Sequence, residues 1–440
     1  MRVLFVHQNC PGQFKHLAPR LAALPGNEVV FITRPGKPDL PGVRKVEYSP
    51  SREPAASTHR YLRLTEEGVL SGQAVARVAL TVKKQGFTPD VIVAHMGWGE
   101  ALYLKDVWPR AALLGYFEYY YHALGADADF AREEPMTLDD VCRIRTRNAL
   151  HLLNLDAADW GITPTRWQWQ QHPAELRPKI SVVHDGVDVA RAVPDPQAFA
   201  ELRSGLTLRA GDEVITYVAR NLEPYRGFPT FMRAAEMILK RRPKAHILVV
   251  GGDGVSYGSR PKDGGNWREH MLREVDLDPN RIRFIGRVPY DRFLRVLQVS
   301  AAHVYLTVPF VLSWSMLEAM AAGCLVIGSR TPPVEEVIED GKNGLLVDFF
   351  SASDLATRVD EVLDHPDRMR AVREAARDTV RQRYALDVCL PQQQGLVETL
   401  AQGRRPLVEP VDGQRVPPRK ASVSPTSRPR GPQRRAGRAR

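Results

Sequence analysis

The sequence predicts an α/β protein of two domains, each built on a doubly wound parallel sheet. Its 440 residues exceed what a single hydrophobic core usually organises. Short apolar runs alternate with helical patterns along most of the chain, as they do in βαβ units. A Pro- and Ala-rich segment at 190–206 carries no strand pattern and divides this alternation into two series.

The first series lies in residues 1–192, which we expect to form an N-terminal Rossmann-like domain. Helices are predicted through HLAPRLAAL, after the first strand, and over the amphipathic stretch near 67–85. The predicted strands are VLFV at 3–6, VVFIT at 29–33, VIVA at 91–94, ALLGYF at 112–117, WGIT at 160–163 and ISVVH at 180–184.

The second series lies in residues 193–385, the predicted C-terminal Rossmann-like domain. The predicted strands, each followed by a helix candidate, are VITYVA at 214–219, HILVV at 246–250, RIRFIG at 281–286, AHVYLT at 302–307, CLVIGS at 324–329 and GLLV at 344–347. Ligands of doubly wound sheets bind beyond the carboxyl ends of the strands. We therefore expect the functional site in the loops after these strands, in a cleft across which the two domains face each other.

The positive charge of the chain is concentrated at its C-terminal end. The net charge is +10, and residues 401–440 hold 11 Arg and Lys residues against 2 Asp and Glu residues. Residues 403–440 are predicted to be a disordered basic tail, because their Pro-, Ser- and Arg-rich composition cannot bury enough apolar surface to fold. A solvated extension and attraction to anionic lipid or nucleic acid are both open for it. Residues 386–402 are predicted to form a helix that packs back toward the N-terminal domain. Since the rest of the chain is nearly neutral, nucleic acid is not an expected partner.

Composition also bears on location and metal binding. No run of about 18 apolar residues is present, and the opening MRVLFVHQ is too short for the apolar core of a signal peptide. We expect a cytoplasmic protein, with peripheral contact at the inner face of the cell membrane as an open alternative. The four cysteines, Cys10, Cys142, Cys324 and Cys389, lack metal-ligand spacing, so no metal site is predicted.

Two strand ends of the second series carry residues suited to binding an anion. Arg220 and Arg226 follow VITYVA and precede Gly227, and guanidinium groups bind phosphate oxygens in a bidentate, permanently charged way. Two solvated surface arginines are the alternative. The glycine-rich turn from Gly251 to Gly254 follows HILVV and would let backbone N–H groups approach an anion. Such turns also follow buried strands where no ligand binds.

A third strand end leads into SWSMLEAMAAG, a helix pattern of mostly Ala, Met and Leu that predicts burial. The carboxylate of Glu318 would be costly to bury alone, and a ribose diol would supply two hydroxyl donors to it. The helix start near Ser313 and Trp314 offers free N–H groups and a positive dipole end to a diphosphate. The alternative is a capping box from Ser315 to Glu318, in which Glu318 accepts its own N-cap amide.

These motifs together resemble the family-4 glycosyltransferases of the GT-B fold. The resemblance covers roughly residues 1–400 and rests on Arg220 to Gly227, the glycine-rich turn, IGRVPYDRF, LEAMAAG and PPVEEVIEDGKNGLLV. The N-terminal stretches PGQFKHLAPRLA, GWGEALYLKDVWP and LLGYFEYYY resemble a bacterial subgroup of that family more loosely.

The resemblance implies roles for individual residues. In the family the basic pair binds the donor diphosphate and the glutamate opening the LEAMA helix binds the nucleotide ribose, and backbone near the position of Gly12 approaches the donor phosphate or the acceptor. The implied donor-binding residues are Gly12, Arg220, Arg226, Gly252, Val288, Ser313, Trp314 and Glu318. The implied catalytic residues are Arg220, Arg226 and Glu118.

This chain departs from the family pattern at three positions, 310, 226 and 118. The family usually has a second glutamate eight residues before the ribose glutamate, where it contacts the donor sugar, and this chain has Phe310. The second basic residue is usually lysine, whereas Arg226 is an arginine. Glu118 stands where many members have a histidine near the donor sugar, beside aromatic residues, among them Tyr119, that form either an acceptor wall or a packed cluster.

The expected function follows from the resemblance. It implies transfer of a sugar from a UDP- or GDP-type donor to a glycan, lipid-linked or small-molecule acceptor, with retention of anomeric configuration. No cofactor or metal ion is expected, because the nucleotide sugar is a substrate and no Asp-x-Asp stands at a strand end to hold a cation. The alternatives are a nucleotide-sugar epimerase of the same fold and a catalytically idle partner in a glycan-assembly complex.

Overall fold

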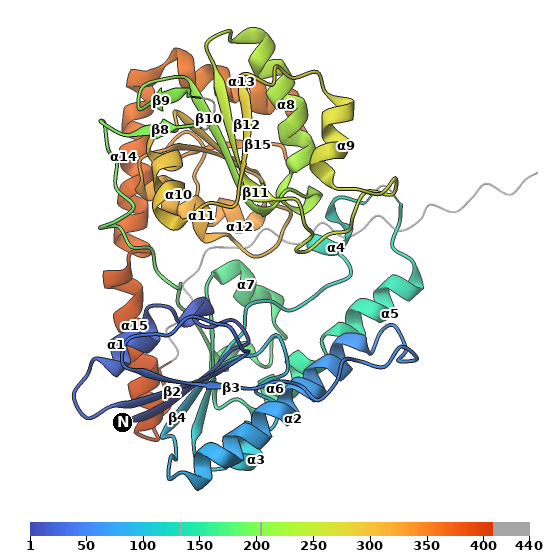
Figure 1. The fold of residues 1–440 in the computed structure, drawn as a ribbon, viewed down its shortest axis with the longest axis vertical. Coiled ribbons are helices and arrows are strands. Elements are labelled where there is room, and N and C mark those ends of the chain that lie inside the picture. Colours follow the sequence, from blue (N-terminus) through green and yellow to red (C-terminus); the bar gives the residue numbers. More distant parts are fainter. Residues whose placement is uncertain (133, 203–204, 408–440) are drawn as a thin grey trace, which may run out of the picture. The chain divides into compact units, whose positions relative to one another are not determined.

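Two parallel sheets organise the chain in a computed structural model that describes residues 1–132, 134–202 and 205–407 (Figure 1). The first sheet consists of seven strands, in the spatial order β3 (Val43–Glu47), β2 (Glu28–Thr33), β1 (Arg2–Val6), β4 (Val91–His95), β5 (Ala112–Tyr116), β6 (Trp160–Thr163) and β7 (Ile180–Val182). The second consists of six strands, in the order β12 (Ile282–Gly286), β11 (His246–Gly252), β10 (Val214–Asn221), β13 (Ala302–Tyr305), β14 (Leu325–Ser329) and β15 (Leu345–Val347).

Helices connect the strands in both halves. Those of the first half are α1 (Leu17–Ala22), α2 (Arg63–Lys84), α3 (Leu104–Val107), α4 (Asp127–Phe130), α5 (Leu138–Arg147), α6 (Ala149–Ala157) and α7 (Arg166–Gln171), with the 3₁₀ turns η1 (Gly12–Phe14) and η2 (Arg177–Lys179). Those of the second half are η3 (Pro224–Arg226), α8 (Phe228–Arg241), α9 (Trp267–Glu274), α10 (Tyr290–Gln298), α11 (Trp314–Ala321), α12 (Pro332–Glu335), α13 (Ala352–Asp364) and α14 (Pro366–Arg383). All neighbouring strands of the two sheets pair in parallel, which such helical crossovers require.

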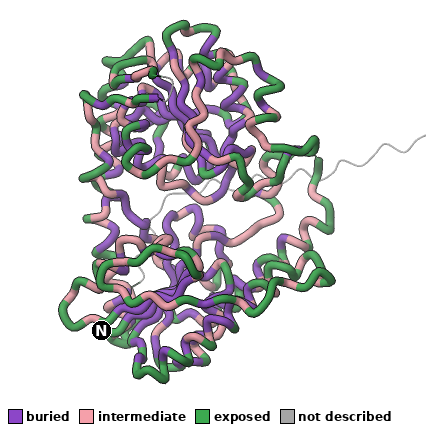
Figure 2. Tube along the Cα trace, in the orientation of Figure 1, coloured by how far each residue is buried: buried purple, intermediate pink, exposed green. Residues whose placement is uncertain are grey.

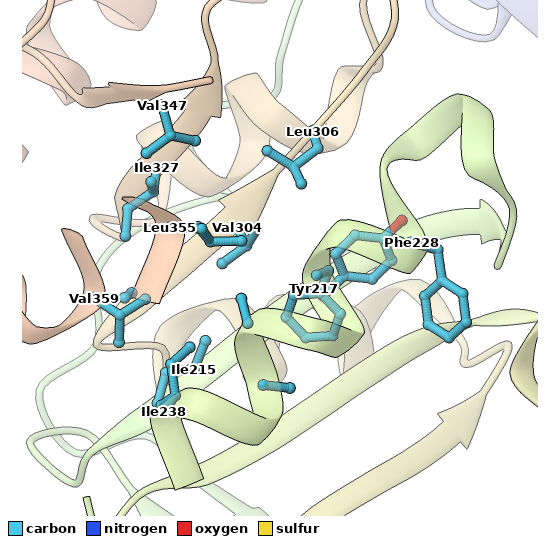
Figure 3. Packing of buried hydrophobic residues seen from close by; sticks show 14 of the residues in the cluster. Ile215, Tyr217, Phe228, Ile238, Val304, Leu306, Ile327, Val347, Leu355 and Val359 are labelled. Carbon is cyan, nitrogen blue, oxygen red and sulfur yellow. The ribbon is translucent and has the colours of Figure 1, made fainter. Parts of the chain in front are cut away.

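The core of the second half shows why its sequence folds in this way. Helix α8 begins after Gly227 with Pro229 in its first turn, and its apolar face packs on the sheet beside Ile215 and Tyr217 of β10. Figure 3 shows residues of this cluster, among them Ile238 of α8 and Val359 of α13. Buried positions concentrate along the strands of both sheets (Figure 2), as expected when helices cover the sheets.

The last helix, α15 (Leu386–Ala401), belongs by its packing to the first sheet. Its residues Leu390 and Val397 share an apolar cluster with Val3 and Phe5 of β1. Of the predicted tail, residues 403–407 are described and contain no helix or strand, and 408–440 lie outside the described residues. The predicted domain boundaries stay predictions.

The predicted α/β class is confirmed, and each predicted apolar run contains a strand. Strand β3 was not predicted, because its sequence VRKVE alternates charge with apolar residues at the sheet edge. The prediction of no strand at 190–206 was wrong, because β8 (Phe199–Glu201) pairs there with β9 (Thr207–Arg209) as a short antiparallel hairpin. Within the described ranges, no helix combines the length and the apolar character needed to span a bilayer.

Candidate active site

Each sheet has a topological switch point beside its first strand. Strand β1 lies between β2 and β4, and β10 lies between β11 and β13. Doubly wound sheets bind their ligands in the crevice at such a point. Gly12 follows β1 there, and Arg220 stands near the carboxyl end of β10, so the predicted residues occur at both switch points.

Arg226 is a buried cation, and within residues 1–132, 134–202 and 205–407 it has no carboxylate partner. Its Nη1 donates to the Tyr305 hydroxyl at 3.1 Å, the Thr307 hydroxyl at 2.8 Å and the Val311 carbonyl at 3.1 Å. All three acceptors are neutral, so the charge of the guanidinium is not compensated. A buried charge of this kind favours binding of an anion.

The turn that aims Arg226 depends on a glycine. Gly227 has φ of +64°, and a Cβ added there would lie 2.5 Å from Cβ of Leu306. Only glycine combines that backbone conformation with so close a neighbour. The tight approach of this turn to the residues after β13 keeps Arg226 beside Thr307.

The charge of Arg220, in the second half of the chain, acts on Glu118 in the first half without a direct contact. Arg220 is exposed, and it forms no ion pair with any residue that the structure describes. Burial would raise the pKa of Glu118, but the effects of His95, Gln13 and the charge of Arg220 together lower it. Glu118 is therefore a carboxylate at neutral pH, and its side chain is one-third exposed.

Two stacked histidines, His95 and His7, lie beside Glu118. His95, the last residue of β4, places Nε2 3.6 Å from Oε2 of Glu118. The His7 ring stacks on it with centroids 4.6 Å apart, and burial together with His95 holds the pKa of His7 well below its ordinary value. Gln13 contacts both His7 and Glu118. Its Oε1 lies 2.9 Å from Nε2 of His7, and its Nε2 donates to Oε1 of Glu118 at 3.2 Å.

Gly12 lies directly over this cluster. Its φ is +51°, and an added Cβ would lie 2.5 Å from Cδ2 of His7. A side chain at this position would displace the histidine, so the close approach explains the glycine. The role of Gly12 toward a donor stays a prediction.

Side chains closely surround the glycine-rich turn after β11. A Cβ at Gly252 would lie 2.7 Å from Oδ1 of Asn221, and Nη2 of Arg287 donates to the same oxygen at 2.9 Å. The buried carboxylate of Glu223 accepts hydrogen bonds from the backbone amides of residues 256–258 at 3.0 to 3.2 Å. Close packing thus accounts for Gly252, whose donor-binding role stays a prediction.

The start of α11 differs from the expectation in one way, and it excludes the capping box that was the alternative role for Glu318. The backbone N–H of Ser313 is not free, because it donates to the Tyr305 hydroxyl at 2.8 Å. The capping box from Ser315 is not formed, because Ser313 is the N-cap and Oε1 of Glu318 accepts the Tyr290 hydroxyl at 2.8 Å. Burial raises the pKa of Glu318, and the bond from Tyr290 opposes that rise.

Val288 and Trp314, two further residues of the implied donor site, lie near the start of α11. Val288 is half-buried and packs beside the cluster that contains the buried side of α11. Nε1 of Trp314 donates to Oδ2 of Asp185 at 2.7 Å, which joins α11 to the loop after β7. Burial raises the pKa of Asp185 to about 7, against the hydrogen bonds that it accepts from Trp314 and Tyr116.

Phe310 is buried in an aromatic cluster. Its ring centroid lies 4.6 Å from that of Tyr119, 5.7 Å from that of Tyr225 and 5.0 Å from that of Tyr257. Asp127 accepts hydrogen bonds from the hydroxyls of Tyr119 and Tyr225 at 3.0 and 2.8 Å. The aromatic residues near Glu118 were expected to form either an acceptor wall or a packed cluster. Tyr119 belongs to a packed cluster.

Sequence reasoning missed several polar residues that the structure places beside the predicted ones. They are His7, Gln13, Asp127, Asp185, Tyr290 and Arg287. A position directly after a strand was the only available signal, and of these residues His7, after β1, and Arg287, after β12, have it. The partners of the others come from distant segments, which a single sequence does not reveal. Across the described ranges, no group of three His, Cys, Asp or Glu side chains could hold a metal ion.

Two family models match most of the chain, one in each half. Residues 25–192 match the model of the glycosyl transferase family 4 group, and residues 199–379 match that of glycosyl transferases group 1. Both models describe glycosyl transferases, so the two halves of the chain match a sugar-transferring class of protein. The chain belongs to the family-4 glycosyltransferases, as the resemblance predicted.

Relatives of known name are moderately similar. D-inositol 3-phosphate glycosyltransferase of Corynebacterium aurimucosum is 26% identical over 305 residues, which cover 67% of this chain and 68% of that relative. The protein of the same name from Mycolicibacterium vanbaalenii is 29% identical over 219 residues, 48% of this chain and 46% of that relative. The alignments thus span 46% to 68% of the length of these curated relatives.

Solved structures show the fold. A sucrose-phosphate synthase from Thermosynechococcus elongatus has a TM-score of 0.67 at 20% identity, covering 92% of this chain and all (100%) of that one. HepE of Anabaena in complex with UDP-glucose has a TM-score of 0.62 at 17% identity, covering 91% and 100%. The predicted GT-B fold is therefore confirmed.

Proposed function

We propose that this chain transfers a sugar from a UDP- or GDP-type nucleotide sugar to a hydroxyl of a glycan, lipid-linked or small-molecule acceptor. One observation carries the proposal: the buried guanidinium of Arg226, bonded only to neutral groups at the end of the second sheet, has no compensating carboxylate among the described residues. A diphosphate would supply that negative charge. HepE of Anabaena, which shares the fold, has been solved with UDP-glucose, and this supports a nucleotide sugar as the ligand.

The proposal gives each charged residue one task. Arg226 and Arg220, six positions apart in one loop, bind the diphosphate. Glu318 binds the ribose through Oε2, which has no hydrogen-bond partner in the described part of the chain, while Tyr290 holds Oε1. Glu118, whose pKa lies below its ordinary value, places a negative charge near the sugar carbon that reacts.

The reaction that these groups serve is a substitution at C1 of the donor sugar. The bond from C1 to the β-phosphate oxygen breaks, and a bond from C1 to the acceptor oxygen forms on the same face, which retains the anomeric configuration. The acceptor proton passes to the departing diphosphate. Negative charge grows on that diphosphate, where Arg220 and Arg226 stabilise it, and positive charge grows on the sugar ring, which an ionised Glu118 stabilises.

The proposal includes the expected conditions of this reaction. The cations that stabilise the leaving group are side chains, so we propose transfer without a metal ion or a bound cofactor. We also propose that the protein acts in the cytoplasm and reaches lipid-linked acceptors at the inner face of the cell membrane.

The first experiment is thermal unfolding of the purified chain with UDP-, GDP- and ADP-sugars at millimolar concentration. Binding raises Tm by mass action. We expect one nucleotide class to raise Tm, and Arg226→Ala and Glu318→Ala to abolish that rise. Arg110→Ala removes an exposed arginine of the α3–β5 loop, and as the matched control it should respond like the wild type.

Product analysis then separates the proposal from its rivals. Transfer to an acceptor supports it, and loss of transfer in Arg220→Ala and Arg226→Ala by about 10² to 10³ in kcat supports the assigned site. Conversion of the donor without an acceptor would indicate an epimerase. Binding without hydrolysis or transfer for every acceptor tested would indicate an idle partner, and near-normal turnover in both variants would remove the site assignment.

A further inference from the structure

The turn after β1 brings a cation of the first half to the first residue of α11. The ammonium Nζ of Lys15 lies 4.6 Å from the centroid of the Trp314 ring. Lys15 is half-buried, and the structure gives it no hydrogen bond or ion pair with the residues it describes. The Trp314 ring is thus the one contact that the described residues give this charge, so the ammonium is available to a ligand.

The charge of Lys15 reaches the same groups as the proposed donor site. Burial raises the pKa of Glu318 and of Asp185, and Lys15 is among the groups that oppose both rises. Glu318 lies one helical turn beyond Trp314 in α11, and Asp185 accepts the Trp314 indole N–H at 2.7 Å. The ammonium therefore lies within electrostatic range of the beginning of α11.

Two further positive features lie near Lys15. The first turn of a helix carries partial positive charge, and α11 begins at Trp314. Arg226 adds a second positive charge nearby, because its Nη1 donates to the carbonyl of Val311, three residues before Trp314. Three positive features thus border the segment 311–314, and a bound anion would relieve their mutual repulsion.

We propose that Lys15 is a third cation for the donor diphosphate, supplied by the first sheet, where Arg220 and Arg226 come from the second. The inference rests on the proposed function and adds a binding residue to it. An ammonium acts as a point charge on a flexible stem, so arginine should replace Lys15 in charge and reach. Because its ligand is the diphosphate, Lys15 should matter more for a nucleoside diphosphate than for the corresponding monophosphate.

The test is isothermal titration of UDP, GDP and ADP, and of the three monophosphates, into wild type, Lys15→Met and Lys15→Arg. For the base that binds, Lys15→Met should weaken the diphosphate by about 10- to 100-fold and the monophosphate much less. Lys15→Arg should stay within about threefold of the wild type. Lys84→Met, the matched control, removes an exposed lysine at the end of α2 and should change neither affinity.

The outcomes separate this inference from the proposed function. If Arg226→Met loses diphosphate binding while Lys15→Met keeps it, the donor site stands and the role of Lys15 is wrong. If Lys15→Met weakens monophosphate and diphosphate equally, or Lys15→Arg fails to restore binding, Lys15 only supports Trp314 and the inference is overturned. If the wild type binds none of the nucleotides, both the proposed function and the inference about Lys15 are wrong.

Discussion

Nε2 of His95 faces Oε2 of Glu118 at 3.6 Å and has no hydrogen-bond partner among the described residues. Nδ1 of the same ring accepts the backbone N–H of Gly97 at 3.1 Å, which leaves the proton of the neutral ring on Nε2. The imidazole therefore presents a donor to the carboxylate. His95 and Gln13 together favour the ionised form of Glu118, which the chemistry proposed for the donor sugar needs.

The first prediction concerns the charge of Glu118. Glu118→Gln keeps the size of the side chain and an oxygen for Gln13, but it removes the negative charge near the developing positive charge of the sugar. We expect kcat to fall by about 10² to 10³ while the donor KM changes little. Initial rates of transfer measure both constants.

A control distinguishes this effect from a general change of charge. Glu175→Gln neutralises an exposed glutamate of the same half and should leave kcat unchanged. If Glu118→Gln retained more than half of the wild-type kcat, Glu118 would have no catalytic role.

The second prediction concerns Asp185, whose buried carboxyl has its pKa raised to about 7. The ordinary pKa of an unfolded aspartate is about 3.9, so between about pH 4 and pH 7 the folded state holds a proton that the unfolded state has lost. Stability therefore falls as pH rises through this window, by up to about 1.4 kcal/mol per pH unit from this group. Asp185→Asn should remove that contribution.

Urea denaturation at pH 5, 6, 7 and 8 checks this. The free energy of unfolding of the wild type should decline more steeply with pH than that of Asp185→Asn, because asparagine can accept from Trp314 and Tyr116 without ionising. Parallel pH profiles for the two proteins would mean that Asp185 keeps an ordinary pKa in the folded state.

The sequence allowed the sheets to be predicted almost completely, and the exceptions have a physical cause. Buried parallel strands are continuous apolar runs, so β1 and β10 stand out from their surroundings. The edge strand β3 alternates charged and apolar residues, and β8 is three residues long and largely exposed, so neither gives an apolar run.

The candidate site was predictable only where a residue type and a strand end coincide. Arg220 and Arg226 meet that condition at the end of β10, and Arg226 is buried with no carboxylate partner among the described residues. Hydrogen bonds between residues far apart in the sequence leave no local sequence pattern from which to predict them. Tyr290, 28 positions before Glu318, donates its hydroxyl to the carboxylate that the alternative capping box would have used, and Tyr305 accepts the Ser313 N–H that was expected to be free.

The third prediction concerns Phe310, which stands where the family usually has a glutamate that contacts the donor sugar. Its burial among Tyr119, Tyr225 and Tyr257 indicates a packing role. Phe310→Ala should lower the free energy of unfolding by roughly 3 to 5 kcal/mol. Phe199→Ala, at an aromatic side chain that is 48% exposed, should cost only about 0.5 kcal/mol. A Phe310→Ala protein as stable as the wild type would contradict the packing role.

The fourth prediction compares two glycines in denaturation experiments. Gly227→Ala forces an L residue to φ of +64° and brings Cβ to 2.5 Å from the side chain of Leu306, so it should cost about 1 to 3 kcal/mol and also weaken donor binding by moving Arg226. Gly395→Ala, inside α15 with no atom within 4 Å of the new Cβ, should stabilise the protein by about 0.5 to 1 kcal/mol. The opposite signs separate backbone fit from any general effect of alanine. If Gly227→Ala were as stable as the wild type and bound donor equally well, the turn before α8 would not be what holds Arg226 in place.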